Sequence, residues 1–120
     1  MGANTKLIQQ AYDAFDKGDI AAVIALLDEN VEWTSPRVLP HGGEFSGPVQ
    51  VGKFFEGIGA NWDSLVLDIE SVSDAGASTV VGVVRAKGMH KDGTAREYGA
   101  AHLFDVRNGK IARFREYVDL

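Results

Sequence analysis

The 120-residue chain contains no cysteine. This absence excludes a disulfide framework, a thiol nucleophile and a thiolate metal site. The histidines His41, His90 and His102 lie far apart in the sequence, and their spacing matches no short zinc-binding pattern. The residues therefore predict no metal site, and they imply no organic cofactor.

Long hydrophobic runs are absent as well: no segment approaches the about 20 apolar residues that a membrane-spanning helix needs, and no charged-then-apolar leader opens the chain. We therefore expect a cytoplasmic protein without a membrane partner. The net charge is −5, which argues against a nucleic-acid partner. Phosphate-loop, dinucleotide-binding and nucleophile-elbow motifs are also missing.

The composition that is present, 45% hydrophobic and 24% charged, predicts one compact domain over residues 1–120. Hydrophobic periodicity predicts a helix over residues 5–17 and a second that begins after Asp19 as its N-cap. A third helix opens at Pro48, a residue type favoured in the first helical turn. Between the last two, residues 31–36 are expected to form a short strand, and residues 37–47 a loop.

From residue 65 onward the pattern changes to β, with strands expected at residues 65–72, 78–91, 94–107 and 110–120. The element order α-α-β-α-β-β-β-β predicts an α+β fold. In it, a curved antiparallel β-meander forms a cone-shaped roll with the helices on its concave side. Such a roll leaves an apolar cavity, which is suited to a small hydrophobic ligand.

Glycines give the finer expectations for these strands. Asp92-Gly93 and Asn108-Gly109 are typical of two-residue hairpins, because both central positions of a type I′ turn need positive φ. Gly82, Gly88 and Gly99 lie inside long strands, where we expect bends or bulges.

Three stretches, residues 11–33 (AYDAFDKGDIAAVIALLDENVEW), 42–48 (GGEFSGP) and 108–119 (NGKIARFREYVD), resemble the SnoaL-like branch of the nuclear transport factor 2-like superfamily. The resemblance implies a ketosteroid isomerase-like and polyketide cyclase-like fold and a homodimer. Relatives include ketosteroid isomerases, polyketide cyclases, epoxide hydrolases, dehydratases and proteins without any chemistry, so each functional residue has to be considered separately.

The isomerase pattern is not retained. Its tyrosine, base and acid positions correspond to Ala11, Ser35 and Ala101, and Tyr12 lies one helical position from the tyrosine site. A residue one position along a helix points about 100° away. The resemblance therefore implies that the family's ketosteroid isomerisation mechanism is excluded.

Arg115-Glu116-Tyr117 aligns with an Arg-Asp-Tyr triplet on the last strand of the epoxide hydrolases, and Glu116 also aligns with the catalytic acid of the polyketide cyclases. The second hydrolase pair corresponds to Val83 and Arg85, so that its acid is replaced by a cation. The resemblance therefore implies a cyclase-like acid at Glu116 without the complete hydrolase set.

Glu116 is accordingly the first candidate catalytic residue. Strand alternation places it on one face with Phe114 and Val118, where burial would raise its pKa and suit a general base. Arg85 is the second candidate: on the same face it would hold a developing negative oxygen or pair with Glu116. With the opposite strand parity, Arg85 would be a surface residue. The alternative for Glu116 is a structural glutamate in a salt bridge with Arg85.

The other site predictions follow from the cavity. We expect substrate-binding side chains at Tyr12, Phe15, Trp33, Phe54, Trp62, Ala101, Leu103 and Phe114. His102 follows Ala101 and so alternates to the convex face as a surface or interface histidine. The same counting places a homodimer patch of Val80, Val84, Phe104 and Tyr117 on that face.

The residues and the resemblance together support two classes of function. The first is an enzyme in which Glu116 moves a proton of a hydrophobic carbonyl or polyketide-like substrate. The second is a domain of the same fold without chemistry, which binds a ligand or another protein.

Overall fold

The computed structural model describes residues 2–120, and its three helices lie close to their expected positions. They are α1 (Ala3–Asp16), α2 (Ile20–Ile24) and α3 (Gly47–Asn61). The side chain of Asp19 accepts a hydrogen bond from the Ala22 backbone N–H at 3.1 Å, which confirms the predicted N-cap of α2. Pro48 lies in the first turn of α3, as predicted.

Six strands form one sheet in the order β2-β1-β6-β5-β4-β3. Their bounds are β1 (Leu27–Ser35), β2 (Gly43–Ser46), β3 (Trp62–Asp74), β4 (Thr79–His90), β5 (Ala95–Arg107) and β6 (Lys110–Asp119). The predicted α+β meander is confirmed, with two differences. The short strand β2 forms inside the segment expected to be a loop, and β1 pairs with β6 in parallel. No hairpin joins β1 to β6, so local turn signals do not indicate this pairing.

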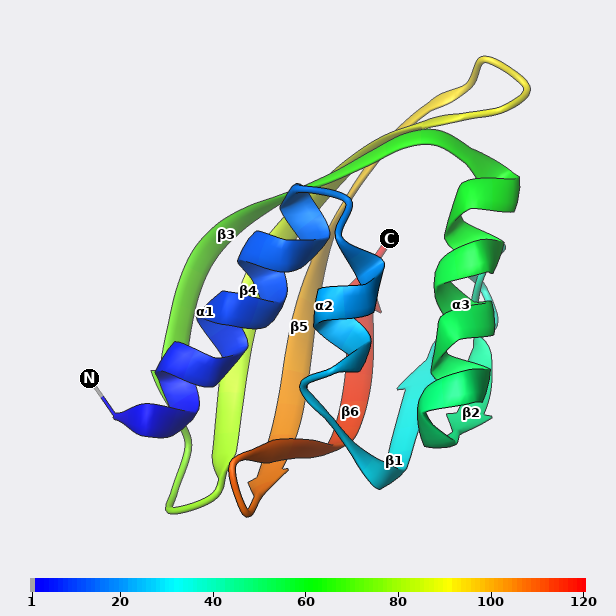
Figure 1. The fold of residues 1–120 in the computed structure, drawn as a ribbon. Coiled ribbons are helices and arrows are strands. Elements are labelled where there is room, and N and C mark those ends of the chain that lie inside the picture. The colour runs from blue at the N-terminus through cyan, green and yellow to red at the C-terminus, as the bar shows by residue number, and fades with distance from the viewer. Residues whose placement is uncertain (1) are drawn as a thin grey trace.

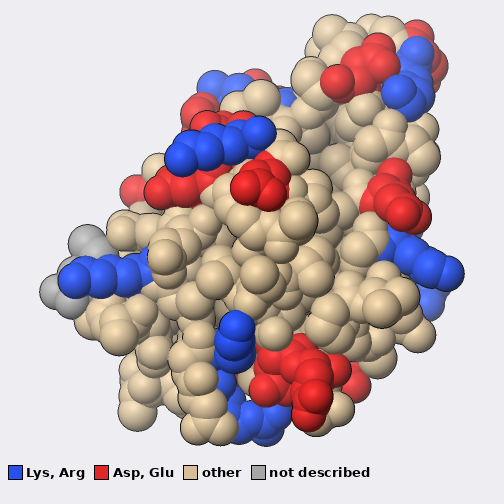
Figure 2. All heavy atoms as spheres, viewed as in Figure 1, with Lys and Arg blue, Asp and Glu red and all other residues tan. Residues whose placement is uncertain are grey.

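The sheet curves around the helices, and α1, α2 and α3 all lie on its concave side (Figure 1). The core is between these two layers, and its most deeply buried side chains are Ile8, Val31, Val51, Val80, Val84 and Ile111. Figure 2 shows charged side chains of both signs around the margin of the helix-covered face. More charged side chains lie on the hairpin that joins β4 to β5 and projects from the sheet, and uncharged atoms cover the middle of the face. The residues that can meet a ligand are therefore those that point into this concave layer.

Strand register decides which residues point inward. Gly82 of β4 pairs with His102 of β5, and His102 pairs with Glu116 of β6, so these three form a row on the concave face. On β5 the inward row is Tyr98, Ala100, His102, Phe104 and Val106, all of which are buried. His102 therefore lies inside, and its predicted convex position is wrong.

The same row corrects three further predictions. Ala101 and Leu103 lie on the outer face of β5, so neither can line the cavity. Of the predicted homodimer patch, Val80, Val84 and Phe104 are core residues, and Tyr117 alone is exposed. The physical reason is that the Val83-Val84 and Ala100-Ala101 pairs are equally apolar, so composition does not show which member of each pair faces inward.

The glycine predictions have mixed outcomes. Asn108 and Gly109 both have positive φ, 52° and 73°, which confirms that hairpin. At the other turn only Gly93 has positive φ, so Asp92-Gly93 is not a two-residue turn of this type. The β4–β5 ladder runs through Gly82, Gly88 and Gly99 without a register shift, so the bulges predicted there are absent from it.

No helix within residues 2–120 is both long enough and apolar enough to cross a membrane.

Candidate functional site

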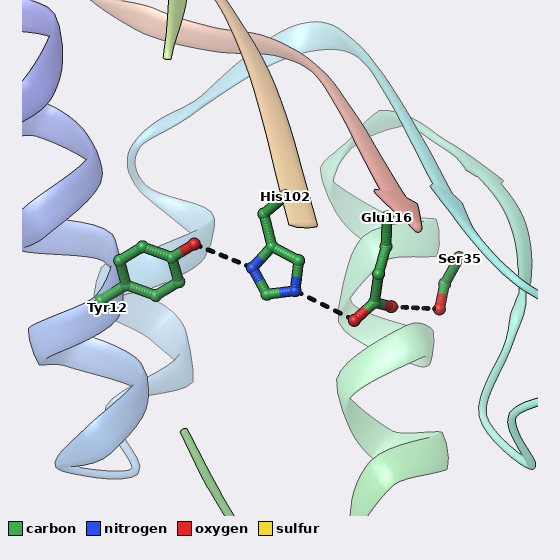
Figure 3. A network of polar contacts seen from close by, with 4 residues as sticks. All are labelled: Tyr12, Ser35, His102 and Glu116. Atoms are coloured by element: carbon green, nitrogen blue, oxygen red, sulfur yellow. Dashed lines mark hydrogen bonds and ion pairs between the residues drawn. The ribbon is translucent and has the colours of Figure 1, made fainter. Parts of the chain in front are cut away.

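Four side chains form a continuous polar chain on the concave face (Figure 3). Tyr12 Oη of α1 lies 2.8 Å from His102 Nδ1 of β5, and His102 Nε2 lies 2.9 Å from Glu116 Oε2 of β6. Ser35 Oγ, at the end of β1, donates to Glu116 Oε1 at 2.7 Å. Residues far apart in the sequence therefore meet in one hydrogen-bonded unit.

The sheet register explains how the chain assembles. His102 and Glu116 are cross-strand partners, so both side chains leave the sheet on the same side. Tyr12 approaches from α1 directly over Gly82, the next residue in that row. A Cβ at Gly82 would overlap Tyr12 Oη and lie only 3.0 Å from Tyr12 Cζ. The absence of a side chain at Gly82 therefore leaves the space that the Tyr12 phenol occupies.

The protonation of the chain follows from its hydrogen bonds. Burial raises the pKa of Glu116, but the hydrogen bonds that its carboxylate accepts from His102 and Ser35 outweigh this effect, so the net pKa lies below its ordinary value. The raised pKa predicted from the sequence is therefore wrong. Because an ionised carboxylate only accepts hydrogen bonds, His102 Nε2–H donates to Glu116. In a neutral imidazole, Nδ1 then accepts the Tyr12 O–H.

Tyr12 stays a phenol at neutral pH, since burial and then the Glu116 charge raise its pKa. The side chains of His102 and Glu116 are only 6% and 8% exposed, so water barely reaches them. The unit Tyr12–His102–Glu116 thus has the arrangement of a hydroxyl, an imidazole and an orienting carboxylate, which can store and return one proton.

An apolar cavity of about 70 Å³ adjoins this chain. Its lining consists mainly of aromatic and aliphatic side chains, with Tyr12, His102 and Glu116 as part of the wall. A water molecule needs roughly 10–15 Å³ of such space, so the cavity holds several waters or one small molecule. The site therefore combines a compact apolar volume with one buried proton-holding unit.

Six predicted site residues line this cavity: Tyr12, Phe15, Trp33, Phe54, Phe114 and Glu116. Trp33 stacks on Phe114 with ring centroids 4.0 Å apart, because the two are neighbours in the parallel β1–β6 pairing. Trp62, although 96% buried, is absent from the lining, which corrects its predicted contact with substrate.

Arg85 lies away from the cavity. Its Nε is 2.6 Å from Glu97 Oε1, and its side chain is 46% exposed on the outer face of β4. The Glu97 hydrogen bond and charge raise the pKa of this guanidinium, which stays in solvent. Arg85 therefore has the surface position that the sequence left as an alternative, and its predicted catalytic role in the cavity is wrong, because Gly82, Val84 and Ala86 are the β4 residues that face inward.

Sequence reasoning missed His102 and His41 as cavity residues. His102 was assigned to the wrong face, and His41 lies in a loop where strand or helix periodicity gives no orientation. His41 is 6% exposed and lines the cavity, and its Nδ1 accepts a hydrogen bond from Trp62 Nε1–H at 3.1 Å. The pairing of two buried aromatic side chains 21 residues apart has no signal in a single sequence.

Within residues 2–120, no three histidine, aspartate or glutamate side chains gather closely enough to hold a metal ion.

Comparisons with known proteins identify the fold and the family. The SnoaL-like domain family matches residues 8–114 of the chain. An NTF2-like protein of Burkholderia thailandensis has 30% sequence identity and a TM-score of 0.91, over 99% of this chain and 92% of that one. No curated protein matches the chain.

Two other solved structures share the fold at lower identity. TerC, co-crystallised with polyporic acid, is 21% identical with a TM-score of 0.88, over 98% of this chain and 92% of TerC. A ketosteroid isomerase-like protein of Catenulispora acidiphila, in complex with trimethylamine, is 17% identical with a TM-score of 0.83, over 95% and 85%. The chain belongs to the SnoaL-like domain family and has the nuclear transport factor 2-like, ketosteroid isomerase-like fold.

Proposed function

We propose that the protein catalyses proton transfer on a small hydrophobic carbonyl compound bound in the cavity. One observation carries this proposal: the buried Tyr12–His102–Glu116 chain forms part of the wall of an otherwise apolar cavity. An apolar wall binds the body of the ligand, and a proton-holding unit in the same wall acts where water is excluded.

The proposed step begins with the neutral imidazole of His102. Tyr12 Oη takes a proton from the carbon beside the carbonyl while its own proton passes to His102 Nδ1. The Glu116 carboxylate, 2.9 Å from His102 Nε2, stabilises the resulting imidazolium. Return of the proton to another atom of the ligand completes an isomerisation or prepares a ring closure.

The cavity volume favours a ligand smaller than a multi-ring polyketide. Pockets for drug-sized ligands span about 300–1,000 Å³, whereas this one measures about 70 Å³. The Catenulispora acidiphila protein, which was crystallised with trimethylamine, illustrates that the same fold accommodates small molecules. We therefore place the substrate among ketones of about one ring.

Hydrogen–deuterium exchange tests this function without the natural substrate. Cyclopentanone, cyclohexanone and acetophenone in D2O are followed by NMR, and the protein is expected to accelerate loss of the α-proton signal for at least one of them. Glu116→Gln should remove about 100-fold or more of that acceleration. Glu97→Gln is the matched control, since Glu97 lies on the outer face and pairs with Arg85. No acceleration with any ketone, or an unchanged Glu116→Gln, would overturn the proposal.

A second candidate function is ligand binding without chemistry. This function is favoured because both nitrogens of His102 and both oxygens of Glu116 already have hydrogen-bond partners within the protein. Under this reading a ketone binds wild type and Glu116→Gln alike and its α-protons exchange at the buffer rate.

A further inference from the structure

His41 is a polar side chain of the cavity wall that takes no part in the Tyr12–His102–Glu116 chain. It lies in the loop between β1 and β2, and its ring packs edge-on against Phe54 with centroids 5.5 Å apart. Its side chain is buried in the same lining that contains Glu116. A ligand in the cavity can therefore contact both His41 and the hydrogen-bonded side chains of Tyr12, His102 and Glu116.

The hydrogen bond from Trp62 fixes the tautomer of His41. An indole Nε1–H can only donate, so the His41 Nδ1 that receives it at 3.1 Å carries no proton. The single ring proton must then be on Nε2. Burial lowers the pKa of His41, and this effect outweighs the nearby Glu116 carboxylate, which raises it, so the ring is neutral at pH 7.

His41 Nε2–H makes no hydrogen bond to any residue from 2 to 120. Trp33, which also lines the cavity, has a buried indole Nε1–H without a partner. In contrast, the oxygens of Glu116 are both occupied by protein donors. His41 Nε2–H and Trp33 Nε1–H are thus two donors of the lining residues without a protein acceptor, and they match a ligand that supplies an acceptor oxygen.

We propose that His41 Nε2–H binds the carbonyl oxygen of the ligand, and that Trp62 is a positioning residue that holds His41 in this tautomer. The inference rests on the proposed function for the reaction that follows, but ligand recognition by His41 is separable from it. A donor at the carbonyl oxygen also stabilises the negative charge that develops there when the α-proton leaves.

Trp62 packs against residues of β4. Its indole lies over Gly88, where a Cβ would come within 2.5 Å of the ring, and it stacks on His90 with centroids 4.0 Å apart. Trp62 itself is absent from the cavity lining. Replacing its N–H therefore changes the proton position on His41 without removing a group that touches the ligand.

The test compares two probes of nearly the same shape, cyclohexanone and methylenecyclohexane, which differ in the acceptor oxygen. Dissociation constants are measured by NMR titration for wild type, His41→Phe, Trp62→Phe and Glu97→Gln. Wild type should prefer the ketone, and His41→Phe should lose about fivefold of that preference, the size of one neutral hydrogen bond. Trp62→Phe should lose part of the preference, while Glu97→Gln, on the outer face, should keep it.

The nitrogen chemical shifts of His41 give a readout that a purely structural role of Trp62 would not change. Wild type should show the Nε2–H tautomer alone, and Trp62→Phe should show a mixture of the two tautomers. Equal affinity of wild type for the two probes, including no binding of either, would overturn the inference, as would an unchanged preference in His41→Phe. Failure of the proposed function is seen separately, as an unchanged α-proton exchange rate in Glu116→Gln.

Discussion

The phenol of Tyr12 lies directly over the Cα of Gly82, so closely that no side chain fits between them. Gly82, His102 and Glu116 are successive members of one row across the sheet. The missing side chain at Gly82 therefore lets the Tyr12 hydroxyl reach His102 Nδ1. The position of the proton-holding chain therefore depends on a residue that takes no part in its hydrogen bonds.

Gly82→Ala should displace Tyr12 and break its hydrogen bond to His102. The expected result is a loss of at least 10-fold in ketone α-proton exchange, together with a destabilisation of about 1–3 kcal/mol from overpacking, measured by urea unfolding. Gly99→Ala is the matched control in the neighbouring strand, because a Cβ there meets its nearest atom at an ordinary 3.6 Å. A Gly82→Ala variant as active as Gly99→Ala would contradict the role given to this glycine.

His102→Phe should destabilise the fold by about 2–3 kcal/mol, because it removes a hydrogen bond to a buried carboxylate that is then left under-satisfied. The double variant His102→Phe/Glu116→Leu should regain part of this loss, since no charge stays buried. Urea unfolding of the single and double variants measures both effects. Equal stability of His102→Phe and wild type would show that Glu116 does not need this partner.

The lowered pKa of Glu116 predicts acid sensitivity. A carboxyl whose pKa is lower in the folded state contributes stability above its unfolded pKa of about 4.5, and this contribution is lost as pH falls toward the folded pKa. Glu116→Gln should therefore show a shallower fall in the free energy of unfolding below pH 4.5. The exposed Glu56→Gln serves as the control and should keep the wild-type slope there.

His41 predicts a second pH effect at higher pH. Because burial lowers its pKa, the unfolded chain binds a proton near pH 6.5 while the folded protein does not, so stability falls as pH drops below that value. His41→Gln should reduce this slope between pH 6.5 and 5, and its amide oxygen can still accept the Trp62 N–H. If His90→Gln and not His41→Gln removes the slope, the burial assigned to His41 is wrong.

The fold was predictable because its signals are local. Apolar periodicity defines α1, and the Asn108-Gly109 turn joins β5 to β6. The site was predictable only where one face is clearly apolar, as for Phe114 and Glu116 on β6. On β4 and β5, adjacent residues are equally apolar, so the sequence does not show which face of the sheet each residue occupies. The side of Arg85 was left open for this reason, and His102 was assigned to the outer face although it lies inside.

Contacts between distant segments had no local signal at all. The Trp62–His41 hydrogen bond and the clearance at Gly82 depend on how a loop and a helix dock on the sheet. Homodimer formation stays a prediction from the family resemblance, and the outer face exposes Val83 and Tyr117 as residues with which to examine it.

The most direct test of the central claim is the ketone α-proton exchange rate of Tyr12→Phe against wild type. Phenylalanine keeps the ring that packs over Gly82 and removes only the hydroxyl that passes the proton to His102. The account predicts a loss of about 100-fold or more, the usual size of an acid–base contribution, with the fold retained. A Tyr12→Phe rate within twofold of wild type would contradict transfer through the Tyr12–His102–Glu116 chain.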